Sequence, residues 1–173
     1  ELEEMLAFAV SFDGPIAIRY PRGSAHQGLQ EYQAPVEYGR SEIIRKGKKI
    51  AVLGVGSMIP SCMEICKGLK DDGYDPTFVN ARFVKPLDVD LLDELAKDHS
   101  LFVTVEENVK SGGYGEHVSA YMEACHPEIR VLSAAVWDRF VPQGNVESLR
   151  SRIGLGVEDI RQAIEDSEEL REQ

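Results

Sequence analysis

Several features that often reveal a protein's chemistry are scarce in this sequence. It contains only three cysteines, Cys62, Cys66 and Cys125, and no CxxC pair. This pattern argues against a disulfide framework. Cys62 and Cys66 lie four residues apart in a helical pattern and could join a metal site. Because no His or Cys cluster accompanies them, we expect two core thiols, and we expect this chain to bind no metal.

Long apolar runs and basic residues are also in short supply. No run approaches the roughly 20 apolar residues that a membrane helix needs, and no basic-then-apolar signal segment opens the sequence. The 19 Lys and Arg residues are outnumbered by 30 Asp and Glu residues, which gives a formal net charge of −11. Such a balance argues against nucleic acid and anionic membranes as partners. We therefore expect a cytoplasmic protein.

The four histidines form no recognisable catalytic or metal-binding set. His99 and His126 fall in expected loops and His117 in an expected helix, and each is interpreted as a surface or packing residue. His26 stands out because it closely follows two arginines. No serine–histidine–acid combination is recognisable. The single tryptophan, Trp137, is interpreted as a packing anchor.

The pattern of elements that is present indicates an α/β fold. Strands alternate with helices of about a dozen residues, which requires crossover connections and predicts a mainly parallel (mixed) five-stranded sheet in a three-layer sandwich. A further β-like run, 15–20, precedes a connector at 24–35, and we expect strands 41–47 and 48–56 to be joined by a tight turn. The remaining strands are expected at 75–81, 101–108 and 129–136, and helices at 1–12, 60–73, 89–98, 117–125, 146–152 and 157–170.

Three stretches at strand ends could carry chemistry. Residues 52–61 include Ser57 and could bind an anion at a strand-to-helix turn, but they lack the glycine fingerprint of a dinucleotide site and the Lys-Ser/Thr of a P-loop. A tight turn with serine or proline at the helix start is the favoured interpretation. Arg82 and Lys85 could bind a phosphate or carboxylate, or form ion pairs that fix a turn while Asp88 caps the next helix.

The third stretch contains adjacent carboxylates, Glu106 and Glu107. Paired carboxylates can perform acid–base chemistry when their environments separate their pKa values. Adjacent residues on an extended chain point in opposite directions, however, so a joint catalytic pair is not expected.

Near the beginning, "IAIRYPRG" places Arg19 and Arg22 around a Tyr-Pro corner. The spacing alone leaves an anion site and ordinary ion pairs equally open. Five motifs then occur together and in order: "DGPIAIRYPRG", "RFVKPLD", "VTVEEN", "GGYG" and "DRFVPQG". In this combination the sequence resembles, nearly from end to end, the C-terminal part of the 1-deoxy-D-xylulose-5-phosphate synthase family.

The resemblance implies a fragment of a three-domain, thiamine-diphosphate- and Mg²⁺-dependent transferase. Residues 1–35 would be the tail of the pyrimidine-binding domain with a linker, and 36–173 a transketolase C-terminal-like domain. The family condenses pyruvate with glyceraldehyde 3-phosphate and releases CO₂, in isoprenoid, thiamine and pyridoxal biosynthesis. Expected partners are the remaining enzyme domains, a second copy in a homodimer, and these two small substrates.

One site residue carries over from the resemblance. Arg22 corresponds to the family's arginine that helps to bind the phosphate of glyceraldehyde 3-phosphate, and a guanidinium can meet a phosphate with two parallel hydrogen bonds. Arg19 is expected to pair with a carboxylate or to pack inside the subunit. The resemblance implies no catalytic or cofactor-binding residue in this chain, which is expected to be inactive alone.

Two alternatives remain open at this stage. The same motifs partly resemble the last domain of transketolases and of 2-oxo acid dehydrogenase β subunits, so the chain could belong to another thiamine-dependent enzyme. It could also be a freestanding module that binds a small anion or mediates dimerisation.

Overall fold

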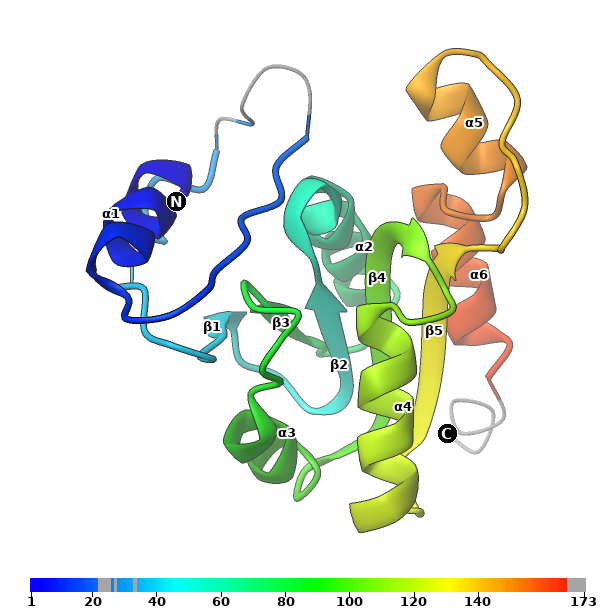
Figure 1. Cartoon of the computed structure of the whole chain (residues 1–173). Coiled ribbons are helices and arrows are strands. Elements are labelled where there is room, and N and C mark those ends of the chain that lie inside the picture. Colours follow the sequence, from blue (N-terminus) through cyan, green and yellow to red (C-terminus); the bar gives the residue numbers. More distant parts are fainter. Residues whose placement is uncertain (22–25, 27, 33, 168–173) are drawn as a thin grey trace.

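The computed structural model describes residues 1–21, 26, 28–32 and 34–167. Within them a five-stranded sheet has the order β1-β3-β2-β4-β5 (Figure 1). The strands are β1 (Glu42–Arg45), β2 (Lys49–Gly54), β3 (Thr77–Asn80), β4 (His99–Val109) and β5 (Arg130–Val136). The helices are α1 (Leu2–Ser11), the 3₁₀ turn η1 (Gly56–Met58), α2 (Ile59–Asp71), α3 (Val89–Leu95), α4 (Tyr114–Cys125), α5 (Val146–Arg152) and α6 (Val157–Glu165).

The sheet is mainly parallel, with one antiparallel edge strand. β3, β2, β4 and β5 run in the same direction, and β1 pairs with β3 in the opposite direction. The apolar runs of β2 and β4 occupy the middle of the sheet, where both faces are covered. The predicted mixed, three-layer α/β architecture is confirmed.

Successive side chains of β2 divide the core into two layers. Ile50 and Val52 pack with buried residues of α2 and α6, whereas Ala51 and Leu53 pack with those of α3 and α4. This alternation follows from the two-residue period of a strand. Cys62 and Cys66 lie on the α2 side of the core, so the prediction of two core thiols is confirmed.

A tight turn of three residues, 46–48, joins β1 to β2, as predicted. The two strands are not neighbours in the sheet, because β3 lies between them. The backbone N–H of Lys48 donates to the carbonyl of Asp75 at 2.6 Å, just before β3. The turn therefore passes the start of a strand that comes later in the chain.

The expected strand at 15–20 is absent from the structure. These residues adopt no regular secondary structure and are mostly exposed. β-type side chains alone do not make a strand, because an adjacent strand must satisfy the backbone groups. Two helix ends also differ: α3 ends at Leu95 instead of residue 98, and α6 ends at Glu165, while residues 168–170 of the predicted helix lie outside the described residues.

The N-terminal helix is held to the rest of the molecule by aromatic rings. Phe8 of α1 and Phe12, which directly follows the helix, stack on Tyr38 with ring centroids 6.5 and 5.1 Å away, and Phe83 contacts Phe8 edge-on. No residue of α1 is buried, and Val10 is 90% exposed. The predicted domain boundary near residue 35 stays a prediction. No helix of the described part of the chain is long and apolar enough to cross a membrane.

Candidate functional site at the carboxyl edge of the sheet

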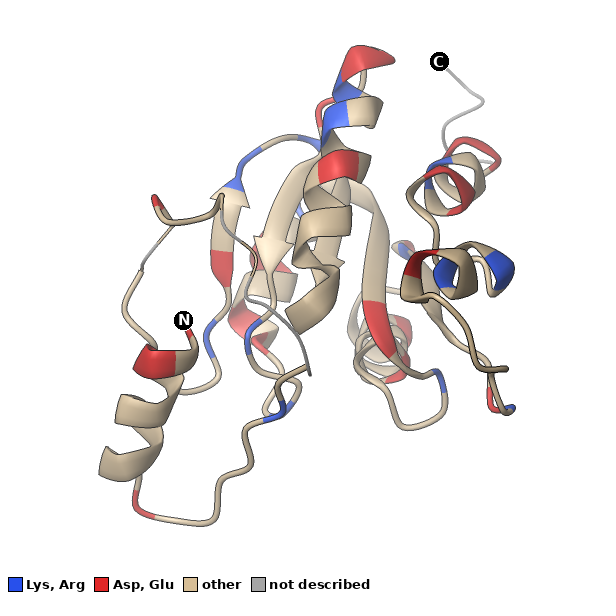
Figure 2. Ribbon diagram, turned by 90° about the horizontal axis from the view of Figure 1, so that it is seen from above, with Lys and Arg blue, Asp and Glu red and all other residues tan. Residues whose placement is uncertain are grey.

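The carboxyl ends of the parallel strands meet at one edge of the sheet, uppermost in Figure 1. Ligands of open α/β sheets usually bind outside this edge. Ser57 lies there in η1, Arg82 follows β3, and Glu106 and Glu107 belong to the last part of β4. Figure 2 looks down on this edge and shows acidic and basic segments close together around it.

Glu107 is the centre of a polar cluster formed by four separate segments. Arg150 of α5 donates from Nε to Glu107 Oε1 and from Nη2 to Oε2, both at 3.0 Å. The Ser57 hydroxyl donates to the same Oε2 at 2.9 Å. Arg19, from the extended N-terminal segment, donates to the backbone carbonyl of Glu107 at 3.3 Å. We call Arg19, Ser57, Glu107 and Arg150 the edge cluster.

The electrostatics of the edge cluster keep Glu107 ionised. The hydrogen bonds from Arg150 lower the pKa of the Glu107 carboxyl, and Ser57 and the nearby charge of Arg19 act in the same direction against partial burial. A carboxylate with a forked guanidinium contact is held in one orientation. The cluster is therefore suited to positioning chain segments, whereas a proton-transfer group needs a pKa nearer to the working pH.

Glu106 points the opposite way from Glu107, as predicted. Its side chain is in the core, 1% exposed, and accepts hydrogen bonds from the backbone N–H groups of Tyr114 at 3.0 Å and Gly115 at 2.8 Å. These donors are the free N–H groups at the start of α4, where negative charge is favoured. A Cβ at position 113 would lie 2.6 Å from Glu106 Oε1, which explains the glycine there. Glu106 has a structural role.

Arg82 forms an ion pair and is not available to a ligand. Its side chain is 3% exposed, and its Nη2 lies 2.6 Å from Glu42 Oε2. Asp88 caps α3 by accepting from the Leu91 N–H at 3.3 Å, so the ion-pair and capping interpretation of this turn is confirmed. Lys85 is exposed before a cis peptide bond to Pro86, and its role is not assigned.

Of the two arginines of "IAIRYPRG", the structure describes Arg19 but not Arg22. Arg22 lies outside the described residues, so its role in phosphate binding stays a prediction. Arg19 is exposed and contacts the main-chain carbonyl of Glu107, so it neither lies in a strand nor packs inside the subunit. His26 is exposed.

The remaining cysteines and histidines do not form a site. Burial raises the pKa of the Cys62 thiol, and it raises that of Cys66 to about 12. His99 is buried in β4, not in the expected loop, with Nε2 2.7 Å from the Thr77 hydroxyl. The described residues contain no group of three or more His, Cys, Asp or Glu side chains that could hold a metal ion.

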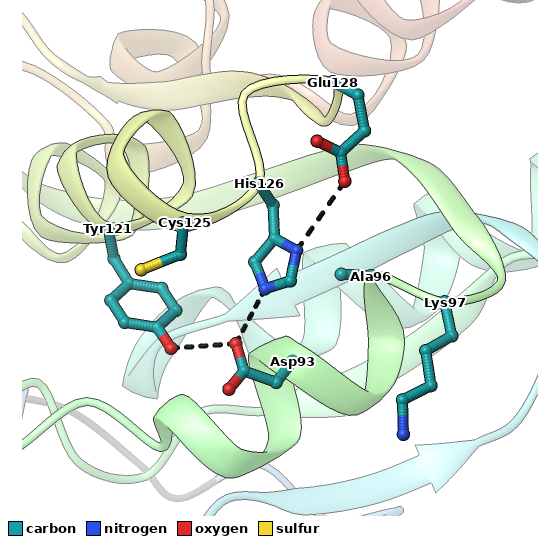
Figure 3. Close-up of a pocket in the computed structure, with 7 residues that line it drawn as sticks. All are labelled: Asp93, Ala96, Lys97, Tyr121, Cys125, His126 and Glu128. Carbon is teal, nitrogen blue, oxygen red and sulfur yellow. Dashed lines mark hydrogen bonds and ion pairs between the residues drawn. The ribbon is translucent and has the colours of Figure 1, made fainter.

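A pocket of about 470 Å³ lies away from the edge cluster, between α3 and the end of α4 (Figure 3). Asp93 Oδ1 accepts hydrogen bonds from the Tyr121 hydroxyl and from His126 Nε2, both at 2.8 Å. His126 Nδ1 lies 3.6 Å from Glu128. The bonds among Asp93, Tyr121 and His126 tie α3 to α4 and its end.

Apolar side chains are exposed beyond β5, next to the edge cluster. Trp137 is 58% exposed, so its interpretation as a packing anchor is wrong, and Phe140 is 103% exposed. The ammonium of Lys110 lies 5.2 Å from the centre of the Trp137 ring. Val141 and Val146 are exposed as well. This exposed apolar surface adjoins α5, which carries Arg150.

Sequence reasoning did not single out Arg150. It lies 43 positions after Glu107, and no local spacing relates the two residues. The available signals were the acidic end of a predicted strand and the basic last turn of a predicted helix, and neither identifies the other as its partner.

Comparisons with known proteins identify the family to which this chain belongs. Residues 39–160 match the family model described as "Transketolase, C-terminal domain". The chain is 42% identical over 161 residues to the 1-deoxy-D-xylulose-5-phosphate synthase of Lachnoclostridium phytofermentans, a match that covers 92% of this chain and 26% of that protein. It is 40% identical over 167 residues to the same-named protein of Nitrosomonas europaea, covering 96% of this chain and 26% of that one.

Solved structures show the same fold. A structure titled "Split gene transketolase, inactive beta4 tetramer" has a TM-score of 0.72 and 29% identity, and the match covers 79% of this chain and 45% of that one. Transketolase from Campylobacter jejuni has a TM-score of 0.52 and 18% identity, and covers 75% of this chain and 19% of that one. The chain thus spans about a quarter of the length of the synthases that it matches.

Proposed function

Because the chain belongs to the family of transketolase C-terminal domains, we propose that it forms the C-terminal part of a 1-deoxy-D-xylulose-5-phosphate synthase. The proposed enzyme is a transferase that joins pyruvate to glyceraldehyde 3-phosphate with loss of CO₂ and supplies isoprenoid and thiamine biosynthesis. The observation that carries this proposal is the 42% identity along 92% of the chain to a synthase of that name.

The proposed role of this chain is to complete the enzyme without performing chemistry. Of its predicted site residues, Arg22 would bind the phosphate of glyceraldehyde 3-phosphate, with the preceding proline restricting the backbone that directs it. The described residues at the carboxyl edge are engaged in internal contacts: Glu106 with α4, Glu107 with Arg150, and Arg82 with Glu42. Such an arrangement supports a positioning role.

Thiamine diphosphate and Mg²⁺ would be held by other parts of the proposed enzyme. The cofactor supplies the electron sink for the decarboxylation. Among the described residues, no cluster of three or more His, Cys, Asp or Glu side chains could hold a metal ion. No reaction step is therefore assigned to cofactor contacts of this chain.

We also propose that this chain assembles with the remaining domains of the enzyme and that the enzyme forms a homodimer. The proposed location of the enzyme is the cytoplasm. The support for assembly is the exposure of large apolar side chains, namely Trp137, Phe140, Val141 and Val146, together with Leu2, Leu6 and Val10 on α1. Exposed apolar side chains that gather in one region are typical of interaction surfaces. Sedimentation of the assembled enzyme should show a dimer, and a monomeric active enzyme would contradict this part.

A second candidate is another thiamine-dependent enzyme, a transketolase in particular. It is favoured by the 29% identity to the split-gene transketolase structure. The synthase is preferred because identity to the proteins of that name is higher, 42% and 40%.

The decisive experiment is a chimera in which this chain replaces the matching C-terminal region of the Lachnoclostridium phytofermentans synthase. We expect the chimera to form 1-deoxy-D-xylulose 5-phosphate from pyruvate and glyceraldehyde 3-phosphate in the presence of thiamine diphosphate and Mg²⁺. The isolated chain and the relative without its C-terminal region should form none.

Transketolase substrates provide the matched control for the chimera. A folded chimera that transfers two-carbon units between sugar phosphates, and makes no product from pyruvate, would favour the second candidate. Turnover by the isolated chain would contradict its proposed incompleteness.

A further inference from the structure

We propose that Glu107 is a positioning residue that holds the segment carrying Arg19 on the carboxyl edge of the sheet. The consequence for substrate binding rests on the proposed synthase function, whereas the structural clamp does not. The edge cluster, Arg19, Ser57, Glu107 and Arg150, carries the inference.

The side chain of Glu107 is fixed by two neighbouring elements. Arg150 makes two parallel hydrogen bonds of 3.0 Å to its carboxylate, and Ser57 adds a third of 2.9 Å. The pairing of β4 with β2 ends at Val105, and its pairing with β5 is irregular between Val105 and Val109. The three side-chain bonds therefore hold Glu107 in place, together with the carbonyl and the negative charge that it offers to a passing segment.

The segment that carries Arg19 has few other attachments to the rest of the structure. Residues 13–21 form no strand and are mostly exposed. Within the described part of the chain, the bond of 3.3 Å from Arg19 Nη2 to the Glu107 carbonyl is the hydrogen bond that joins residues 13–21 to other elements. The position of this segment thus depends strongly on one contact.

The negative charge of Glu107 acts on both arginines. Arg150 forms a forked contact with the carboxylate, and Arg19, which is bonded to the carbonyl of the same residue, is close enough to lower the pKa of the carboxyl. A neutral amide at position 107 would lose the charged fork with Arg150 and the attraction for Arg19. The clamp therefore requires an acid at position 107, because a neutral amide keeps the size but not the charge.

The clamp on Arg19 also bears on the proposed phosphate-binding residue, Arg22. Arg19 precedes Arg22 by three positions in the sequence, so a restraint on Arg19 limits the main chain that leads to the proposed phosphate-binding residue. Holding a binding group in place before the substrate arrives lowers the entropic cost of binding. Glu107 would thus act on glyceraldehyde 3-phosphate through the segment and not by contact.

The structural part is tested by nuclear magnetic resonance on the chain itself. Backbone ¹⁵N order parameters of Ile18 and Arg19 should fall from ordered values to below roughly 0.6 in Glu107→Gln and in Arg19→Gln. Arg19→Lys, which keeps the charge, should retain more order than Arg19→Gln. Glu158→Gln, which removes a different carboxylate paired with an arginine, Arg161, is the matched control and should change neither value.

The functional part is tested in the chimera described above. Glu107→Gln and Arg19→Gln should each raise KM for glyceraldehyde 3-phosphate by roughly tenfold, and KM for pyruvate by less than about twofold. The variant with both substitutions should raise KM for glyceraldehyde 3-phosphate little further than either single variant, because both substitutions remove the same clamp.

The outcomes separate the two proposals. Unchanged order parameters in Glu107→Gln overturn the clamp, and equal changes in both KM values overturn the positioning role. A wild-type chimera that makes no product counts against the proposed function alone, and the order parameters of the isolated chain then decide the clamp.

Discussion

Arg82 and Glu42 form an ion pair of 2.6 Å in which the two side chains are only 3% and 9% exposed. The same guanidinium donates to the carbonyl of Ala34 at 2.9 Å, and Glu42 accepts from the N–H of Ala34 at 3.0 Å. One buried pair therefore joins β1, the end of β3 and the chain that leads into the sheet.

Replacing Arg82 by leucine should strongly destabilise the fold. The substitution leaves the Glu42 carboxylate buried without its partner, which costs roughly 3–5 kcal/mol in free energy of unfolding. Urea denaturation followed by circular dichroism measures this loss. Glu158→Gln, which removes an exposed carboxylate paired with Arg161, is the control and should cost less than about 1 kcal/mol. Equal effects of the two substitutions would show that burial does not matter here.

Replacing Glu106 by glutamine should destabilise the start of α4. The amide retains one acceptor but turns an N–H group toward the N–H groups of Tyr114 or Gly115, so one charged hydrogen bond is lost. We expect a loss of about 1.5–3 kcal/mol in urea denaturation. Glu123→Gln on the exposed face of the same helix should leave the midpoint unchanged. An unaffected Glu106→Gln would argue against the structural role of this carboxylate.

Asp93 should contribute stability that disappears in acid. Hydrogen bonds from His126, and then from Tyr121, lower the pKa of the Asp93 carboxyl below its ordinary value of about 3.8 in the folded state (Figure 3). A lowered pKa stabilises the fold above pH about 3.8, and this contribution is lost as pH falls through the lower folded value. The wild type should therefore unfold at higher urea than Asp93→Asn near pH 6, and the difference should shrink below pH 4.

The matched control for this pH profile is Glu94→Gln, an exposed carboxylate on the same helix. It should show no comparable difference at either pH. A wild-type advantage over Asp93→Asn that stays constant down to pH 3 would contradict the assignment.

Native thiol labelling should detect one of the three cysteines. Cys125 is exposed, while Cys62 and Cys66 are buried with raised pKa values, so iodoacetamide at pH 8 should modify Cys125 first. Mass spectrometry should find one label in the native chain and three after unfolding in urea. Cys125→Ser should abolish the native label, and rapid native labelling of Cys66 would show that the α2 side of the core opens readily.

The sequence predicted the core of the fold because its signals are local. The buried strands β2 and β4 are continuous apolar runs, and α2 shows apolar residues at helical spacing up to its end near Gly73. Local chemistry also predicted the cap at Asp88 and the opposite directions of Glu106 and Glu107. In each case the cause lies within a few residues of the effect.

The errors occurred where a distant segment decides the outcome. Residues 15–20 look like a strand but have no partner strand, and no local signal shows that β3 lies between β1 and β2. His99 and Trp137 were misjudged because their exposure depends on neighbours supplied by the whole fold.

By itself, the sequence determined the α/β class, the apolar strands of the core, the capped helix and the likeness to the synthase family. Only the tertiary structure decided that Arg82 pairs with Glu42, and that Arg19 and Arg150 meet at Glu107. The physical reason is that hydrophobic periodicity and capping act over a few residues, whereas ion pairs and hydrogen bonds across 40 to 88 positions form only after the parallel strands bring their carboxyl ends to one edge.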